Sequence, residues 1–172
     1  MKASYPENWP QFFTATIQNW KHLSADEKDK AVVINCLKFL VENNKVQINA
    51  FVIMSNHIHL IWQAAAGNTL ADIQTSFKKF TSQQFIKLLK QDKKLNNYEV
   101  NSADRKHHFW KRNSLGIELF TVKTFQQKLE YIHYNPVRAE ICNNPEEYKY
   151  SSAAFYERNV DEFGILEHYA GS

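Results

Sequence analysis

Residues 46–63, VQINAFVIMSNHIHLIWQ, constrain the fold of this 172-residue chain more than any other stretch. Two runs rich in β-branched and aromatic residues flank Ser55 and Asn56, which predicts two strands joined by a tight turn. Side chains two apart on a strand point to the same face, so His57 and His59 would lie side by side while Ile58 enters a core. Such a pair alone is more often structural than metal-binding. Two histidines also cannot complete the roughly four ligands of a zinc site.

The hydropathy pattern predicts five further elements around this hairpin. A helix should begin near Ser24, whose hydroxyl would cap it, and its apolar face should include Phe39. A longer helix should carry Phe80 on its apolar face and a row of lysines on the other. The predicted strands cover residues 11–17 and 107–110, and the predicted helices cover residues 30–44, 69–95 and 124–134.

The resulting order is β-α-β-β-α-β followed by an extra helix. This order predicts an α+β fold of the ferredoxin-like, split βαβ type. Its four-stranded antiparallel sheet would carry two helices on one face, and the extra helix would carry a tyrosine. With only 4 Gly and 4 Pro and no repeat, residues 1–172 should form a single domain. Its core would span about residues 10–142, with residues 143–172 a tail that packs on the domain or extends it.

Bulk composition narrows the class of protein without deciding it. A net charge of +3, from 21 Lys+Arg and 18 Asp+Glu, permits a nucleic acid partner and does not require one. Cys36 and Cys142 form no C-x-x-C pair, which excludes a zinc ribbon or a redox motif. No apolar run is long enough for a membrane span and the start lacks a signal-peptide core, so we expect a cytoplasmic protein.

A second informative segment is residues 130–138, EYIHYNPVR. On a helix, Tyr131 and Asn135 are four apart and share a face. A tyrosine hydroxyl with a pKa near 10 attacks phosphate poorly near neutral pH unless a metal ion or a base assists it. The plainer interpretation is that Tyr131 packs and Asn135 caps a helix, because Pro136 disfavours α conformation in the residue before it. Tyr134 is the alternative nucleophile, and His133 is expected to pack in the core or to contact DNA.

Together the two segments resemble a known family. The run MSNHIHLIWQ resembles the His-hydrophobic-His signature of single-tyrosine transposases, and YIHYNPVRAEI is similar to the tyrosine helix of the REP-associated tyrosine transposases. The resemblance extends over roughly residues 10–156. Two positions depart from the pattern: Ser55 stands where the family usually has proline, and Asn135 stands where insertion-sequence relatives have glutamine.

This resemblance implies a metal-dependent enzyme that cleaves and rejoins single-stranded DNA bearing palindromic hairpins. His57, His59 and Asn135 would bind Mg²⁺ or Mn²⁺. Tyr131 would attack the scissile phosphate, giving a 5′-phosphotyrosine and a free 3′-OH. The protein would act as a monomer, as REP-associated relatives do, or as a homodimer. The residues expected to contact DNA are Lys78, Lys79, Arg112, Arg138 and Tyr150. A solvated helix face is the simpler explanation of the lysines. A solvated side chain explains Arg138, and packing of the tail explains Tyr150, equally well.

Three other functions compete with this one. A domesticated protein could keep the fold and bind DNA hairpins without cleaving them. Replication-initiator nicking uses the same metal-and-tyrosine chemistry with a different arrangement of motifs. A structural zinc protein would need ligands that the sequence does not offer.

Overall fold

The computed structural model describes residues 8–18, 26–98 and 109–169. Four strands form one sheet in the order β2-β3-β1-β4, and every neighbouring pair is antiparallel. The strands are β1 (Gln11–Thr16), β2 (Val46–Ile53), β3 (His57–Ala64) and β4 (Leu115–Glu118). The helices are α1 (Glu27–Glu42), α2 (Leu70–Gln91), α3 (Val122–His133), α4 (Asn135–Arg138) and α5 (Ala153–Arg158), with 3-10 turns η3 (Leu95–Tyr98) and η4 (Pro145–Glu147).

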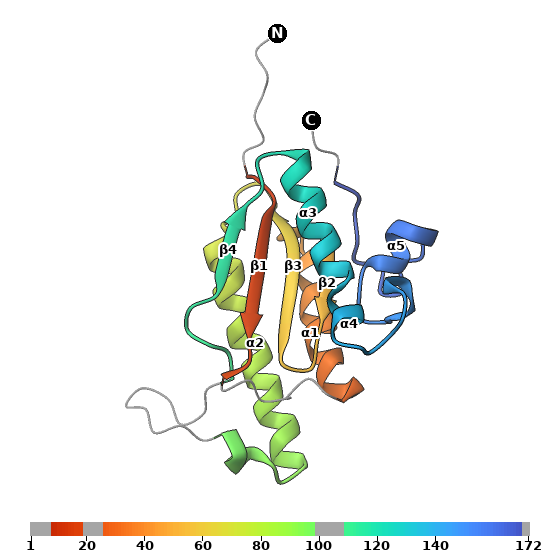
Figure 1. Cartoon of the computed structure of the whole chain (residues 1–172). Coiled ribbons are helices and arrows are strands. Elements are labelled where there is room, and N and C mark those ends of the chain that lie inside the picture. Colours follow the sequence, from red (N-terminus) through yellow and green to blue (C-terminus); the bar gives the residue numbers. More distant parts are fainter. Residues whose placement is uncertain (1–7, 19–25, 99–108, 170–172) are drawn as a thin grey trace.

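Helices α1 and α2 cover one face of the sheet, and α3 lies on the other (Figure 1). Strand β3 sits between β1 and β2, so β1 and β2 run parallel to each other without touching, as a split βαβ unit requires. The predicted α+β ferredoxin-like architecture is therefore confirmed, including the extra helix that carries Tyr131. No helix within the described ranges is long and apolar enough to cross a membrane.

The sheet separates two hydrophobic clusters because side chains alternate along each strand. On β3, Ile58 and Trp62 pack beneath α1 and α2. Ile61 points the opposite way and packs with Ile132 of α3. His57 and His59 share that second direction, so alternation alone moves both imidazoles out of the large core and toward the tyrosine helix.

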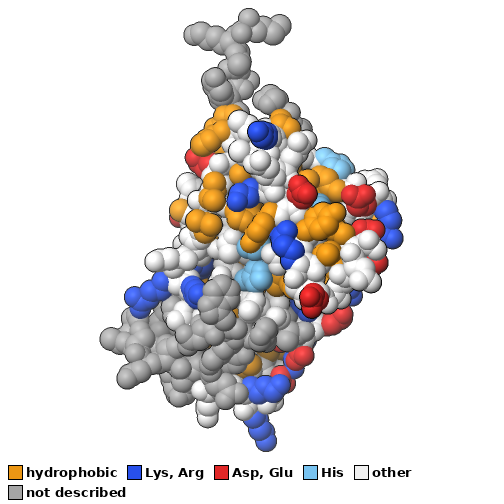
Figure 2. All heavy atoms as spheres, viewed as in Figure 1, with side chains coloured by type: hydrophobic (Ala, Val, Ile, Leu, Met, Phe, Trp, Pro, Cys, Tyr) orange, Lys and Arg blue, Asp and Glu red, His pale blue; other side chains and the backbone are white. Residues whose placement is uncertain are grey.

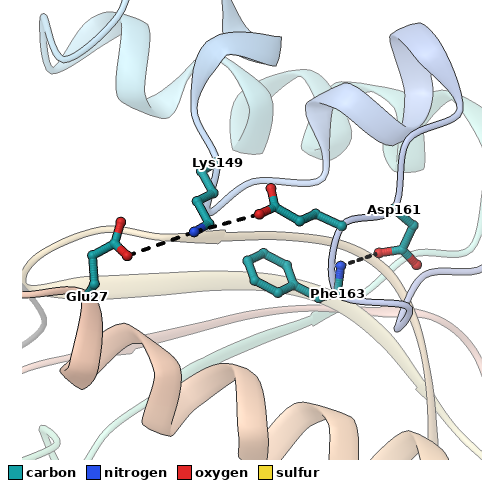
Figure 3. A network of polar contacts seen from close by, with 5 residues as sticks. Glu27, Lys149, Asp161 and Phe163 are labelled. Atoms are coloured by element: carbon teal, nitrogen blue, oxygen red, sulfur yellow. Dashed lines mark hydrogen bonds and ion pairs between the residues drawn. The ribbon is translucent and has the colours of Figure 1, made fainter.

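The residues after α4 run along the free edge of β2. The Ile53 amide donates to the Tyr150 carbonyl at 2.9 Å, and the Glu167 amide donates to the Ile48 carbonyl at 2.9 Å. In Figure 3, Lys149 lies between Glu27 of α1 and a glutamate of the same C-terminal segment, Glu162, at 3.8 and 3.6 Å. The segment thereby satisfies backbone groups that an exposed edge strand would offer to another chain.

Three predictions about elements were wrong, each for a local reason. The fourth strand of the sheet is β4, Leu115–Glu118. Of the strand predicted over residues 107–110, residues 107 and 108 lie outside the described residues, and Trp110 contributes only an isolated bridge to Ile17. The apolar pattern misled here, because all four residues of β4 are exposed while Trp110 is buried. Phe39 and Phe80 are 59% and 40% exposed, so each lies at the border of its helix's apolar face. The expected cap Ser24 lies outside the described residues.

Asp29 in the first turn of α1 is a buried carboxylate, 7% exposed. Burial, with a contribution from Asp26, raises its pKa from 3.8 to about 6. A raised pKa means that the folded state holds a proton that the unfolded state has released. The protein should therefore gain stability as the pH falls from about 7 to about 4, and lose it as the pH rises through 6.

We expect Asp29→Asn to raise the free energy of unfolding at pH 7.5 by about 1–3 kcal/mol and to flatten its pH dependence between pH 4 and 7. Urea unfolding at several pH values measures both effects. Glu42→Gln, on an exposed residue of the same helix, is the control and should change neither. An Asp29→Asn variant that is less stable than wild type at pH 7.5 would contradict the burial argument.

Candidate active site

His57 and His59 lie at the start of β3, beside the central strand β1. Thr16 of β1 is opposite His57, and Thr14 is opposite His59. The turn before them closes with the His57 carbonyl accepting from the Met54 amide at 2.9 Å. The serine in place of the usual proline at position 55 therefore leaves the hairpin in register and both imidazoles on one face. The two rings are 4.9 Å apart between centroids.

His59 is almost completely buried, with 5% of its surface exposed. Its Nδ1 is hydrogen-bonded to Thr14 Oγ1 at 2.8 Å, and its ring stacks on Phe12 at 5.4 Å. Burial lowers its pKa to about 3, helped by the positive charges of His57, Arg138 and Lys128. His59 is thus a neutral imidazole with Nδ1 engaged, which leaves Nε2 as its free nitrogen.

His57 is oriented in the same way by its neighbour. Its Nδ1 lies 2.7 Å from Asn56 Oδ1. An amide oxygen only accepts, so Nδ1 carries the proton and Nε2 carries the lone pair of the neutral ring. That Nε2 is 3.3 Å from Asn135 Oδ1, which places two acceptors against each other. Burial lowers the pKa of His57, and the Asn135 contact opposes that shift. The arrangement favours a cation, or a proton, between the two atoms.

Tyr131 approaches the histidines from α3. The helix begins with a capping box in which Thr121 and Thr124 bond reciprocally, and it buries Phe125 and Ile132 against the sheet. Tyr131 lies on the exposed edge of this contact, 43% exposed, with its ring 5.2 Å from His59. Its hydroxyl-bearing ring is therefore both next to the imidazoles and open to a ligand.

The helix is interrupted just after Tyr131. α3 ends at His133, Tyr134 is its C-cap, and α4 starts at Asn135 with Pro136 in its first turn. The proline therefore breaks the helix where the sequence predicts a bend. Asn135 is the first residue of α4, and its Oδ1 nevertheless lies 3.3 Å from His57 Nε2. The asparagine side chain, although shorter than a glutamine, therefore reaches the site.

Two cations lie over the Tyr131 ring. Arg138 Cζ is 4.7 Å from the ring centroid, and its guanidinium donates to the Tyr131 carbonyl at 2.5 Å. Lys128 Nζ is 5.8 Å from the same centroid and 4.7 Å from that of Phe12. Figure 2 shows this face of the molecule, with histidine surface near its centre and Lys or Arg side chains close by.

Comparison with protein families identifies the family to which this chain belongs. The family described as "Transposase IS200 like" matches residues 13–135, which include both histidines, Tyr131 and Asn135. This chain belongs to the IS200-like transposase family. It is a DNA-processing protein of the transposase class.

A solved structure shares the fold of this chain. A REP-associated tyrosine transposase bound to a REP hairpin shares the fold with a TM-score of 0.66 and 15% sequence identity, over 100% of this chain and 96% of that one. A transposase-like protein from Deinococcus radiodurans R1 matches with a TM-score of 0.49 and 14% identity, over 77% and 95% of the two chains. A comparison with curated proteins found no match.

The donors of this IS200-like transposase suit a divalent metal ion. Nε2 of each histidine remains available after its Nδ1 is bonded, and Asn135 Oδ1 faces one of them. Nitrogen ligands with an amide oxygen suit Mn²⁺ at least as well as Mg²⁺, which prefers oxygen. Within the described ranges no group of three His, Cys, Asp or Glu could hold a metal, so a closed zinc site finds no support there.

The transposase brings together only some of the residues expected to contact DNA. Arg138 lies at the site. Arg112 follows Lys111, whose amide donates to the Thr16 carbonyl at 2.8 Å, and so lies near the His57 end of the sheet. Lys78 and Lys79 belong to α2, on the opposite face (Figure 1). Tyr150 is 7% exposed and packs in the large core beneath α1 and α2, so the structure does not bring it to the site.

The neighbouring histidines and tyrosine have separate places. His133 is buried, and its Nε2 bonds Ser152 Oγ at 2.9 Å. Burial lowers its pKa to about 4. Of the two roles expected for His133, core packing and a DNA contact, the structure shows core packing. Tyr134 is 45% exposed at the helix interruption. His107 and His108 lie outside the described residues.

Sequence reasoning missed the residues that orient the site, namely Thr14, Asn56 and Lys128. Thr14 is 45 positions from His59, and only the pairing of β1 with β3 brings them together. Asn56 precedes His57 directly, so a local signal existed: a turn asparagine next to a candidate ligand can fix its tautomer. Lys128 is one turn before Tyr131 on the same helix, and that spacing was also visible in the sequence.

The Thr14 hydroxyl should stabilise the folded transposase by satisfying the ring of buried His59. We expect Thr14→Val to lower the free energy of unfolding by about 1–3 kcal/mol, because it leaves a buried nitrogen without a partner, and Thr14→Ser to retain most of the stability. Urea unfolding measures this. Thr16→Val on the same face of β1 is the control, since the Thr16 hydroxyl has no hydrogen bond in the part of the chain that the structure describes. Equal losses from both valine variants would argue against the role of Thr14.

Proposed function

We propose that this transposase cleaves and rejoins single-stranded DNA that carries palindromic hairpins, through a covalent 5′-phosphotyrosine on Tyr131. The observation that carries the proposal is the meeting of His57 and His59 from β3 with Tyr131 from α3 and Asn135 from α4. The two histidines are more than 70 positions from Tyr131 and Asn135 in the chain. Separate structural roles for these residues would not require them to lie together.

Each residue of the site has a definite role in the proposal. Tyr131 supplies the attacking oxygen, and its exposure leaves room for a DNA strand. His57, His59 and Asn135 would hold Mg²⁺ or Mn²⁺, which when bound supplies a Lewis acid for the scissile phosphate. Asn56 and Thr14 hydrogen-bond Nδ1 of His57 and His59, respectively, which leaves Nε2 of each imidazole available for a metal ion. The cleaved 3′-OH can attack the phosphotyrosine in the reverse direction, which rejoins strands.

Hairpin DNA is favoured as the substrate by the relative of shared fold, which was solved bound to a REP hairpin. The tyrosine, the histidines and Asn135 all come from one chain. We therefore propose that a monomer contains a complete site, and that a homodimer is not needed to assemble it.

Removing the tyrosine hydroxyl tests the nucleophile. We expect wild-type protein, incubated with hairpin-bearing single-stranded DNA and Mn²⁺, to form a covalent adduct that survives a denaturing gel. Tyr131→Phe should abolish the adduct, because no oxygen remains to attack phosphate. Tyr134→Phe is the matched control, an exposed tyrosine three residues on, and should leave the adduct unchanged.

Two results would overturn parts of this proposal. An adduct that persists in Tyr131→Phe and disappears in Tyr134→Phe would move the nucleophile to Tyr134. A wild-type protein that binds hairpins tightly and forms no adduct with any of them would favour the rival function, a hairpin-binding protein without cleavage activity.

The charge of the site predicts that metal and DNA bind cooperatively. His57, His59 and Asn135 are neutral donors, and the nearby charges of Lys128 and Arg138 are positive. A DNA phosphate would supply the missing negative charge, so we expect Mn²⁺ to bind about 5- to 150-fold more tightly in the presence of DNA.

Electron paramagnetic resonance of free Mn²⁺ measures this affinity, with the Tyr131→Phe variant to prevent cleavage. The His57→Ala/His59→Ala double variant controls for Mn²⁺ bound by DNA alone, and should lose the cooperative part. Equal Mn²⁺ affinity with and without DNA would contradict the electrostatic argument.

A further inference from the structure

Lys128 is a cation beside the candidate nucleophile that the proposed function does not use. It lies on α3 three residues before Tyr131, on the same side of the helix. Its Nζ is within cation–π distance of both Phe12 and Tyr131, at 4.7 and 5.8 Å. Arg138, from α4, lies 4.7 Å from the same tyrosine ring. The phenol is thus approached by one ammonium and one guanidinium from two different helices.

Neither cation is paired with an acid among the residues that the structure describes. Within the described residues, Lys128 and Arg138 form no ion pair with a carboxylate, in contrast to Lys28, which pairs with Asp92, and Lys149, which pairs with Glu27 and Glu162. Both are close enough to lower the pKa of His59 through their charge. The part of the site around Tyr131 therefore has a positive potential, which attracts an anion rather than a free metal ion.

The two side chains are held differently, in a way that suits a shared anion. One Arg138 nitrogen donates to the Tyr131 carbonyl, which fixes the guanidinium while its other N–H groups remain as donors. The Lys128 ammonium lies over the Phe12 ring, and its three protons can turn toward a ligand. An oxyanion next to the tyrosine hydroxyl could accept from both.

We propose that Lys128 and Arg138 together bind the non-bridging oxygens of the phosphate that Tyr131 attacks, with Lys128 a catalytic residue not otherwise assigned. This inference rests on the proposed function. In the step, the bond from Tyr131 Oη to phosphorus forms and the bond from phosphorus to O3′ breaks. The phenol proton leaves to solvent, and the departing O3′ takes up a proton from solvent. Positive donors aimed at the equatorial oxygens stabilise the charge on them throughout.

Cleavage kinetics give the first test. We expect Lys128→Gln to slow single-turnover cleavage by about 10- to 100-fold, the effect of losing one charge-assisted hydrogen bond, and Lys128→Arg to restore most of the rate. Lys123→Gln is the matched control, because it removes an equal charge from an exposed position of the same helix, and should slow cleavage less than about 3-fold. A Lys128→Gln rate equal to that of Lys123→Gln would overturn the proposal.

Binding gives a test that does not depend on activity. The affinity of the Tyr131→Phe variant for hairpin DNA is measured without metal. Each DNA in the series has one phosphate replaced by an uncharged methylphosphonate, at a different linkage in each. At one linkage, the substitution should weaken binding of the parent protein by about 10-fold and should hardly affect binding when Lys128→Gln and Arg138→Gln are added. Lys123→Gln should leave the loss in place.

The two tests separate this inference from the proposed function. If wild-type protein cleaves DNA but no linkage shows coupling to Lys128, the phosphate contact is wrong and the phosphotyrosine chemistry stands. If coupling is found at one linkage but no adduct ever forms, the phosphate contact stands and the cleavage proposal fails.

Discussion

The structure depends on the alternation of side chains along β3. Ile58 and Trp62 complete the core beneath α1 and α2, and the same alternation turns His57 and His59 to the face where α3 lies. A shift of one residue in the pairing of β3 would turn both imidazoles into the large core and turn Ile58 and Trp62 out of it. The free energy that fixes the register of the hairpin therefore also fixes the site. The pairing with β1 adds Thr14, which completes the hydrogen bonding of buried His59.

The tyrosine helix is held against this face from two sides. Ile132 packs into the smaller cluster, and His133 bonds Ser152 of the C-terminal segment, which is itself bonded to β2 through Phe51. Tyr131 lies between these buried contacts and solvent, so it is positioned by its neighbours and not by contacts of its own hydroxyl. The C-terminal segment thus has a part in placing the candidate nucleophile, although it contributes no side chain to the site.

Local patterns in the sequence were enough for the hairpin, the long helices and the pair of histidines, because each has a strong period and clear end signals. The fourth strand could not be found in this way. β4 is a short edge strand, paired only with β1, and all its residues are exposed. Its sequence therefore shows no alternation of buried and exposed residues from which a strand could be predicted. Phe39 and Phe80 show the opposite error, since a large apolar residue at the border of a helix face fits the pattern whether or not anything covers it. The partnership of Thr14 with His59 required the strand order, which no local pattern contains.

The described part of the sheet leaves the face that carries the histidines partly uncovered, which is compatible with the proposed DNA ligand. Among the described residues, α3 lies mainly over β2 and β3 and contacts β1 at Phe12, and no described helix lies over β4 on that face (Figure 1). In the register of β1 with β4, Ile117 is opposite Phe12 and Leu115 is opposite Thr14, so both point to the site's face, where they are 38% and 54% exposed. A small-molecule enzyme would close such a site to exclude water. The proposed ligand is a polymer and needs a site that stays open at its ends, and the exposed side of Tyr131, beside histidines held in the sheet, fits that requirement.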